Sequence, residues 1–135
     1  MKYVLLVEDD LCNQAVIQDI FEFDLSAGEL VCVESGEDAL EQVAQTKPCL
    51  VLMDIGLPGI DGLETTKRLK SSALTKDITV WALTAHAMKG DEAKALAAGC
   101  DQYITKPIET KNLSRRLSDF LETIQPTEEN PCLKC

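Results

Sequence analysis

Six residues with reactive or geometrically special side chains lie directly after four separate apolar runs of the sequence. Three are acids, one carries a hydroxyl, one carries an amine, and the last is a proline next to the amine. Carboxylates that gather in one place are costly unless a cation or a proton is bound. Ligands that are all oxygen favour magnesium, manganese or calcium over zinc. The set comprises Glu8, Asp9, Asp54, Thr84, Lys106 and Pro107.

A divalent cation, a carboxylate, an amine and a hydroxyl are the components of phosphoryl transfer. The amine of Lys106 and the hydroxyl of Thr84 are suited to phosphoryl oxygens rather than to the metal. Asp54 stands alone at the end of its run, and aspartyl phosphates are a known form of covalent catalysis, so Asp54 is the candidate nucleophile. Any one of these acids alone would be interpreted as an ordinary solvated residue. The hypothesis therefore depends on the six residues lying together.

The four runs bring these residues together only if they are strands of one parallel sheet. Continuous apolar runs are typical of strands that are buried on both faces. Alternation of such runs with helical patterns predicts an α/β fold with a doubly wound five-stranded parallel sheet. Ligands of these sheets bind beyond the carboxyl ends of the strands. The expected strands are residues 3–7, 30–33, 50–53, 78–83 and 103–104.

Five helices are expected between and after these strands. Apolar residues at helical spacing predict the first helix, which should end near Gly28, and a capping signal at Ser35 opens the second. The third begins at Gly62, and an alanine-rich fourth stops at Gly99. The fifth has one apolar face and Thr110 as its expected cap.

Length and charge limit the function classes. The chain has 135 residues, of which 45% are hydrophobic, which fits one domain at residues 1–124 and a disordered tail at residues 125–135. The formal charge of -10 argues against partners that are nucleic acids or anionic membranes. No run is long enough for a signal peptide or a membrane span, so we expect a cytoplasmic protein.

Six cysteines do not indicate a disulfide framework, because no export signal precedes them. We expect those inside the domain to be buried, reduced and hydrophobic in character. Cys132 and Cys135 form a lone C-x-x-C, too few ligands for zinc and only a weak match to a prenylation signal. The four domain cysteines are Cys12, Cys32, Cys49 and Cys100.

Four segments of the sequence together resemble one known protein family. Residues 5–10, 52–62, 82–85 and 103–107 together resemble a response-regulator receiver domain of two-component signalling. The resemblance covers about residues 2–124. It implies a flavodoxin-like sheet with the strand order 2-1-3-4-5.

The resemblance also implies roles for the acids. Asp54 would be the phospho-acceptor, and Glu8 and Asp9 the acidic pocket. Asp9, Asp54 and the backbone carbonyl of Gly56 would ligate Mg²⁺, or Mn²⁺ in its place. The chain would then be a signalling switch that catalyses only its own phosphorylation and dephosphorylation, not an enzyme for turnover.

Further residues would report the phosphate. Lys106 would pair with the phosphoryl group, and its bond to Pro107 is expected to be cis. Thr84 would move toward the phosphate, and Tyr103 would turn into the vacated space. This change would remodel the face of the fourth helix, fifth strand and fifth helix for a partner. His86 has a possible role in tuning hydrolysis, with an ordinary loop histidine as the competing interpretation.

The implied phosphate donor is a phosphohistidine of a histidine kinase or a phosphotransfer protein. The downstream protein target is unknown, and the chain would be a monomer or a phosphorylation-dependent dimer. Residues 84–92 and 99–101 resemble stand-alone cell-cycle regulators of the single-domain type, and also receivers of hybrid kinases. A start at Met1 favours the stand-alone form.

Other function classes fit less well. A phosphatase with an aspartyl nucleophile would need a second acid two residues later, where Gly56 stands. A flavodoxin-like electron carrier would need a phosphate-binding loop after the first strand, where acids would repel the phosphate. The alternatives that stay open are a receiver-like interaction module that acts without phosphorylation and a receiver fragment of a hybrid histidine kinase.

Overall fold

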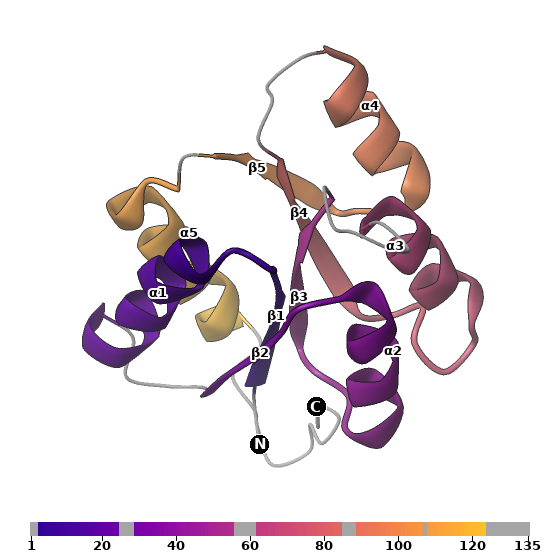
Figure 1. The fold of residues 1–135 in the computed structure, drawn as a ribbon, viewed down its shortest axis with the longest axis horizontal. Helices are drawn as coiled ribbons and strands as arrows, with labels where there is room; N and C mark the ends of the chain where they lie inside the picture. Colours follow the sequence, from indigo (N-terminus) through magenta and orange to yellow (C-terminus); the bar gives the residue numbers. More distant parts are fainter. Residues whose placement is uncertain (1–2, 25–28, 56–61, 85–88, 107, 124–135) are drawn as a thin grey trace.

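The computed structural model describes residues 3–24, 29–55, 62–84, 89–106 and 108–123. A five-stranded parallel sheet runs through its centre (Figure 1). The strand order is β2-β1-β3-β4-β5, which confirms the doubly wound, flavodoxin-like prediction. The strands are β1 (Tyr3–Val7), β2 (Glu29–Val33), β3 (Leu50–Asp54), β4 (Thr79–Thr84) and β5 (Gln102–Thr105).

The register of the sheet aligns the carboxyl ends of its strands. Val7 at the end of β1 pairs with Val33 of β2 and with Met53 of β3. At the other side, Thr84 at the end of β4 pairs with Thr105 at the end of β5. Because all the strands run in the same direction, the residues that follow them meet at one edge of the sheet.

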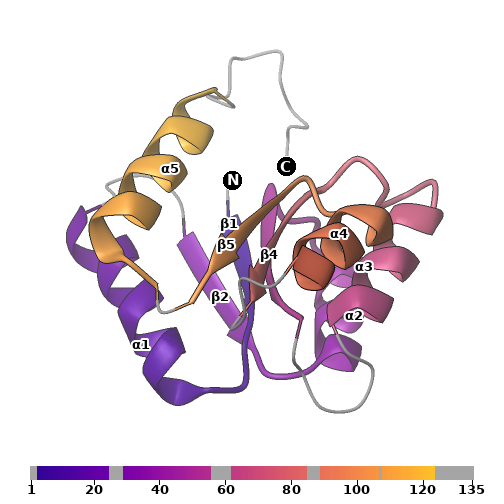
Figure 2. The same cartoon turned by 90° about the horizontal axis from the view of Figure 1, so that it is seen from above.

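Helices cover both faces of the sheet. In Figure 2, α1 and α5 lie on one side, and α2, α3 and α4 lie on the other. The last residues of the first helix, Ile20–Asp24, have π-helical geometry. The helices are α1 (Leu11–Asp19), α2 (Gly36–Gln45), α3 (Gly62–Ser71), α4 (Lys89–Ala98) and α5 (Thr110–Thr123).

The strands divide the core into two layers because successive side chains point to opposite faces. On the side of α1 and α5, Leu6 and Leu52 pack with helix residues such as Leu117. On the other side, Leu5 and Val51 pack with residues of α2, α3 and α4. Both layers are apolar, which explains why the strand sequences are almost continuously hydrophobic.

Capping residues and glycines in the sequence predicted most of the helix ends correctly. Ser35 caps α2, because its Oγ accepts a hydrogen bond of 3.1 Å from the backbone N–H of Asp38. The cap expected at Thr110 was wrong. Thr110 is the first residue of α5, and the carbonyl of Glu109 accepts the first helical bond from Leu113. The end of the first helix near Gly28 lies outside the described residues.

The described cysteines carry no disulfide. Cys49 and Cys100 are buried, as expected, and Cys32 is half-buried. Cys12 is exposed, so the burial prediction was wrong there, because α1 turns this position to solvent. In the described part of the chain, no helix has the length and apolar character needed to cross a membrane.

Candidate functional site

Three carboxylates meet at the carboxyl edge of the sheet. Glu8 follows β1 directly and is fully buried, and Asp54 at the end of β3 is 6% exposed. Asp9 is exposed to solvent. One oxygen from each of these three side chains lies within 4.8 Å of the others. The structure therefore brings together the three acids that the sequence singled out.

Lys106 completes this acidic cluster. Its Nζ lies 2.9 Å from Oε1 of Glu8 and 3.2 Å from Oδ2 of Asp54. The backbone N–H of Lys106 donates a hydrogen bond of 2.7 Å to the carbonyl of Thr84, which ties the residue after β5 to the end of β4. Three carboxylates against one ammonium leave a formal surplus of two negative charges.

The electrostatics of the cluster follow from burial and proximity. Burial raises the pKa of Glu8, Lys106 acts in the opposite direction, and the nearby Asp54 raises the pKa further. For Lys106, burial alone would lower the pKa, but the carboxylates of Glu8 and Asp54 more than offset this effect. The net result is a raised pKa for Lys106, so the ammonium stays charged.

Two polar contacts fix Glu8 in place. The side-chain amide of Gln14, buried on α1, donates a hydrogen bond of 2.7 Å to the carbonyl of Glu8. The backbone N–H of Asp10 donates to Oε2 of Glu8 at 3.1 Å. Sequence reasoning missed Gln14. Its only signal was a polar residue in line with the apolar positions of the first helix.

Gly62 is a second contributor that sequence reasoning did not connect to the site. It is the first residue of α3, and a Cβ at this position would lie 2.3 Å from the carbonyl oxygen of Asp54. Such a contact is far below van der Waals distance with a backbone atom. Glycine therefore lets α3 begin directly against the end of β3, where Asp54 is held.

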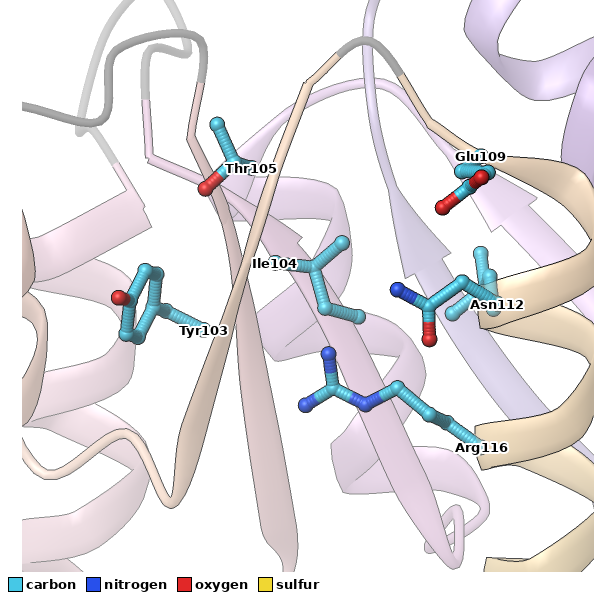
Figure 3. Close-up of a pocket in the computed structure, with 7 residues that line it drawn as sticks. Tyr103, Ile104, Thr105, Glu109, Asn112 and Arg116 are labelled. Atoms are coloured by element: carbon cyan, nitrogen blue, oxygen red, sulfur yellow. The ribbon is translucent and has the colours of Figure 1, made fainter.

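Thr84 and Tyr103 lie beside the cluster on adjacent strands. Thr84 is buried at the end of β4, and Tyr103 is half-buried on β5. In Figure 3 the ring of Tyr103 lies on the opposite side of β5 from Asn112 and Arg116. It packs against the apolar layer beneath α2, α3 and α4. On the α5 side, a hollow of about 450 Å³ is lined partly by Glu109, Asn112 and Arg116.

Three predicted site residues lie outside the described residues. These are Gly56, expected to supply a backbone carbonyl, His86, expected to tune hydrolysis, and Pro107, expected to follow a cis bond. Their sequence-based roles stay predictions.

The donor atoms of the cluster fit a hard divalent cation. All the candidate ligands are carboxylate oxygens, which suit Mg²⁺ and Mn²⁺. Within the described residues, Oε1 of Glu8 is a buried oxygen that faces the Lys106 ammonium at 2.9 Å. The surplus negative charge around this buried carboxylate is a feature that a bound cation would stabilise.

The chain thus has a flavodoxin-like α/β fold, and a cluster of three carboxylates that suits a divalent cation lies at the carboxyl edge of the sheet. A sequence profile of the response regulator receiver domain matches residues 4–118. The chain belongs to this family of two-component signalling proteins.

Individual relatives agree with this assignment. The chain is similar to the polar-differentiation response regulator DivK of Brucella ovis, with 40% identity over 120 residues that cover 89% of this chain and 96% of that protein. Its fold is similar to a putative response regulator from Chloroflexus aurantiacus, with a TM-score of 0.82, 30% identity, and coverage of 90% and 98% of the two chains.

A further similar structure is the receiver domain of the sensor histidine kinase PA1611 from Pseudomonas aeruginosa. The TM-score is 0.79 at 30% identity, and the match covers 90% of this chain and 98% of that one. A magnesium ion is coordinated in the active site cleft of that protein.

Proposed function

We propose that this chain is a phosphorylation-dependent switch in which Asp54 accepts a phosphoryl group. The donor would be a phosphohistidine of a histidine kinase or of a phosphotransfer protein. The observation that carries the proposal is the position of the Lys106 ammonium, 3.2 Å from Asp54 and 2.9 Å from Glu8. This amine provides a positive charge beside the proposed nucleophile.

In the proposed reaction, a carboxylate oxygen of Asp54 attacks phosphorus and forms a new P–O bond. The P–N bond to the donor imidazole breaks, and its electron pair stays on the imidazole nitrogen. Lys106 stabilises the negative charge on the phosphoryl oxygens in the transition state. Asp9 and Asp54, with Glu8 close by, would hold Mg²⁺ or Mn²⁺. The cation would neutralise further charge on the phosphoryl oxygens.

Thr84 and Tyr103 would transmit the modified state. The hydroxyl of Thr84 would donate a hydrogen bond to the phosphoryl group, and Tyr103 would follow by moving toward the space left behind. Both residues stand on adjacent strands next to the cluster, which supports this order of events. The face formed by α4, β5 and α5 would then bind the downstream protein, by a shift between two populated states.

The remaining expectations complete the proposal. The backbone carbonyl of Gly56 would be a further cation ligand, Pro107 would follow a cis bond, and His86 would tune hydrolysis. The protein would work in the cytoplasm as a monomer or as a phosphorylation-dependent dimer. The similarity to the polar-differentiation response regulator DivK supports a regulator of the cell-cycle type, and the magnesium of the PA1611 receiver supports the choice of cation.

The direct test is phosphorylation of the purified chain with a small-molecule phosphodonor and Mg²⁺. We expect an acid-stable, base-labile phosphate that mass spectrometry locates on Asp54, and no such phosphate in Asp54→Asn. The Asp19→Asn variant, an exposed acid on α1, is the matched control and should be phosphorylated like the wild type. Equal labelling of wild type and Asp54→Asn would place the phosphate on another residue, and no labelling of the wild type would leave the interaction module without phosphorylation as the better explanation.

A further inference from the structure

A groove lies between the ends of α2 and α3, on the sheet face away from α1 and α5. The two helices run side by side in Figure 1 and Figure 2. The hollow between them has a volume of about 500 Å³. It is lined by some of the residues between Leu40 and Lys47, in α2 and the turn after it, and by some of those between Arg68 and Thr75, in α3 and its following turn. We call it the α2–α3 groove.

The floor and one rim of the α2–α3 groove are apolar. Val43 and Leu69 form a buried floor, and Leu40 is half-buried beside them. Leu74 stands on the rim with 81% of its surface exposed, the largest value among the large hydrophobic residues that the structure describes. Leaving a leucine this exposed forgoes the free energy of burying its side chain, which a ligand that covers it would recover.

The same groove is basic in an otherwise acidic molecule. Of the described residues that line it, Lys47 and Arg68 are cationic and none is acidic. The chain as a whole has 23 acidic and 13 basic residues. Arg68 pairs with Glu64 at 3.1 Å, but both side chains are about half exposed. Such an exposed pair contributes little to stability because water screens it, so a ligand carboxylate can compete for the guanidinium.

The α2–α3 groove is remote from the acidic cluster. Each helix runs back from the carboxyl edge of the parallel sheet toward the amino edge. Residues that line the groove belong to the second halves of α2 and α3, whereas the acidic cluster stands where β1 and β3 end. A ligand in the groove therefore leaves Asp54 accessible to a phosphate donor.

We propose that the α2–α3 groove binds an acidic peptide segment of a partner protein, with one or two aliphatic side chains. The aliphatic groups cover Leu74 and enter above Val43 and Leu69, and the carboxylates meet Lys47 and Arg68. Charge complementarity selects this ligand, because the formal charge of -10 repels an acidic peptide from most of the molecule. The groove thus gives the protein a docking surface separate from the α4–β5–α5 face.

The test uses three short synthetic peptides and the ¹⁵N-labelled full chain. The probe consists of glutamate pairs and leucine pairs in alternation, one control replaces glutamate by lysine, and the other replaces leucine by serine. We expect the probe alone to shift amide signals of residues 40–47 and 68–75. Its affinity should fall as salt rises, because the contacts are surface charges.

Variants then assign the contacts. Leu74→Ser should weaken binding of the probe about tenfold, which corresponds to about 1.4 kcal/mol, and Arg68→Ser should weaken it in low salt. Leu96→Ser, which changes a leucine of α4 that is 47% exposed, is the matched control and should bind like the wild type. All three variants should still be phosphorylated, so failure of this docking surface is distinguishable from failure of the phosphorylation switch.

Several results would overturn the docking proposal. One is an equal affinity of the wild type and Leu74→Ser for the probe, and another is equal binding of the lysine peptide. Signal shifts confined to α4, β5 and α5 would assign the peptide to the other face. Concentration-dependent shifts of residues 40–47 without any peptide would show that a second copy of the chain occupies the groove instead.

Discussion

Two lysines at opposite edges of the sheet show how the same side chain is used differently. Lys106 at the carboxyl edge stands at a cluster of three carboxylates, and its ammonium lies 2.9 Å from Glu8 and 3.2 Å from Asp54. Lys70 near the amino edge donates to the carbonyl of Ile78 at 2.6 Å and to Asp101 at 3.2 Å. That same carboxylate oxygen of Asp101 accepts a hydrogen bond from the N–H of Val80.

The difference lies in the local charge balance. At the amino edge one ammonium meets one carboxylate, and backbone groups satisfy the rest of both side chains. At the carboxyl edge the acids outnumber the base, which lowers stability unless a cation is bound. A balanced ion pair holds β4 and β5 in place, whereas the cluster at the carboxyl edge keeps an excess of negative charge. Four experiments test whether the two edges differ in this way.

The largest effect is expected from Lys106→Met. Loss of the ammonium removes charge stabilisation from the transition state, and the initial rate of Asp54 phosphorylation should fall by about 100-fold or more. The rate is measured with a small-molecule phosphodonor at saturating Mg²⁺. Lys70→Met is the control and should keep a rate close to that of the wild type. If the Lys106→Met rate stayed within threefold of the wild-type rate, the proposed role of the Lys106 ammonium in phosphorylation would be contradicted.

Mg²⁺ should stabilise the protein through the acidic cluster at the carboxyl edge. At a Mg²⁺ concentration about 100 times its Kd, the free energy of unfolding should rise by about 2.7 kcal/mol. Chelation with EDTA should reverse the gain, as followed by thermal unfolding. Asp9→Asn should lose most of this response, whereas Lys70→Met should respond like the wild type. A full response in Asp9→Asn would remove Asp9 from the cation site.

Lys70→Met should lower the free energy of unfolding and leave the phosphorylation rate nearly unchanged. It leaves the carbonyl of Ile78 and the carboxylate of Asp101 without their charged donor, and we expect the free energy of unfolding to fall by about 2 kcal/mol. Urea unfolding measures the change. Lys67→Met, at an exposed position of the same helix, is the control and should change stability by less than about 0.5 kcal/mol. Equal stability of the two variants would mean that the Lys70 network contributes nothing to the fold.

Effects of similar or smaller size should come from two glycines, one at each edge. Gly62→Ala places a methyl group against the carbonyl of Asp54 and should cost about 1–3 kcal/mol. It should also slow phosphorylation, since Asp54 must shift. Gly99→Ala should cost about 1–2 kcal/mol, because Gly99 has a φ of +111° and its Cβ would approach Lys70. Its phosphorylation rate should be unchanged. If Gly99→Ala slowed phosphorylation and Gly62→Ala did not, the reactive site would belong to the amino edge rather than to the carboxyl edge.

Much of the fold was predictable because the strands are buried on both faces. The first strand was expected at residues 3–7 and is observed there. The second and fifth strands are each extended by polar end residues, Glu29 and Gln102, that join the sheet through their backbone. Such residues carry no hydrophobic signal. The burial of Cys12 was wrong because it depends on the rotation of α1 on the sheet. The cap at Thr110 was wrong because α5 already begins at that residue.

The candidate site was only partly predictable. The four residues Glu8, Asp9, Asp54 and Lys106 were identified because they follow strand signals. The supporting roles of Gln14 and Gly62 were not predicted. Neither a hydrogen bond from a side-chain amide to a backbone carbonyl nor the close approach of a glycine to a backbone carbonyl leaves a distinctive pattern in the sequence. The roles of Gly56, His86 and Pro107 stay predictions.

The sequence by itself determined the parallel sheet, the family resemblance and the types of residue at the carboxyl edge, since these depend on local patterns along the chain. Only the tertiary structure decided that one ammonium stands between Glu8 and Asp54, that the Glu8 side chain is fully buried, and that a basic groove with an exposed Leu74 opens between α2 and α3. These features depend on strand register and helix packing, which set the distances between side chains that are far apart in the chain.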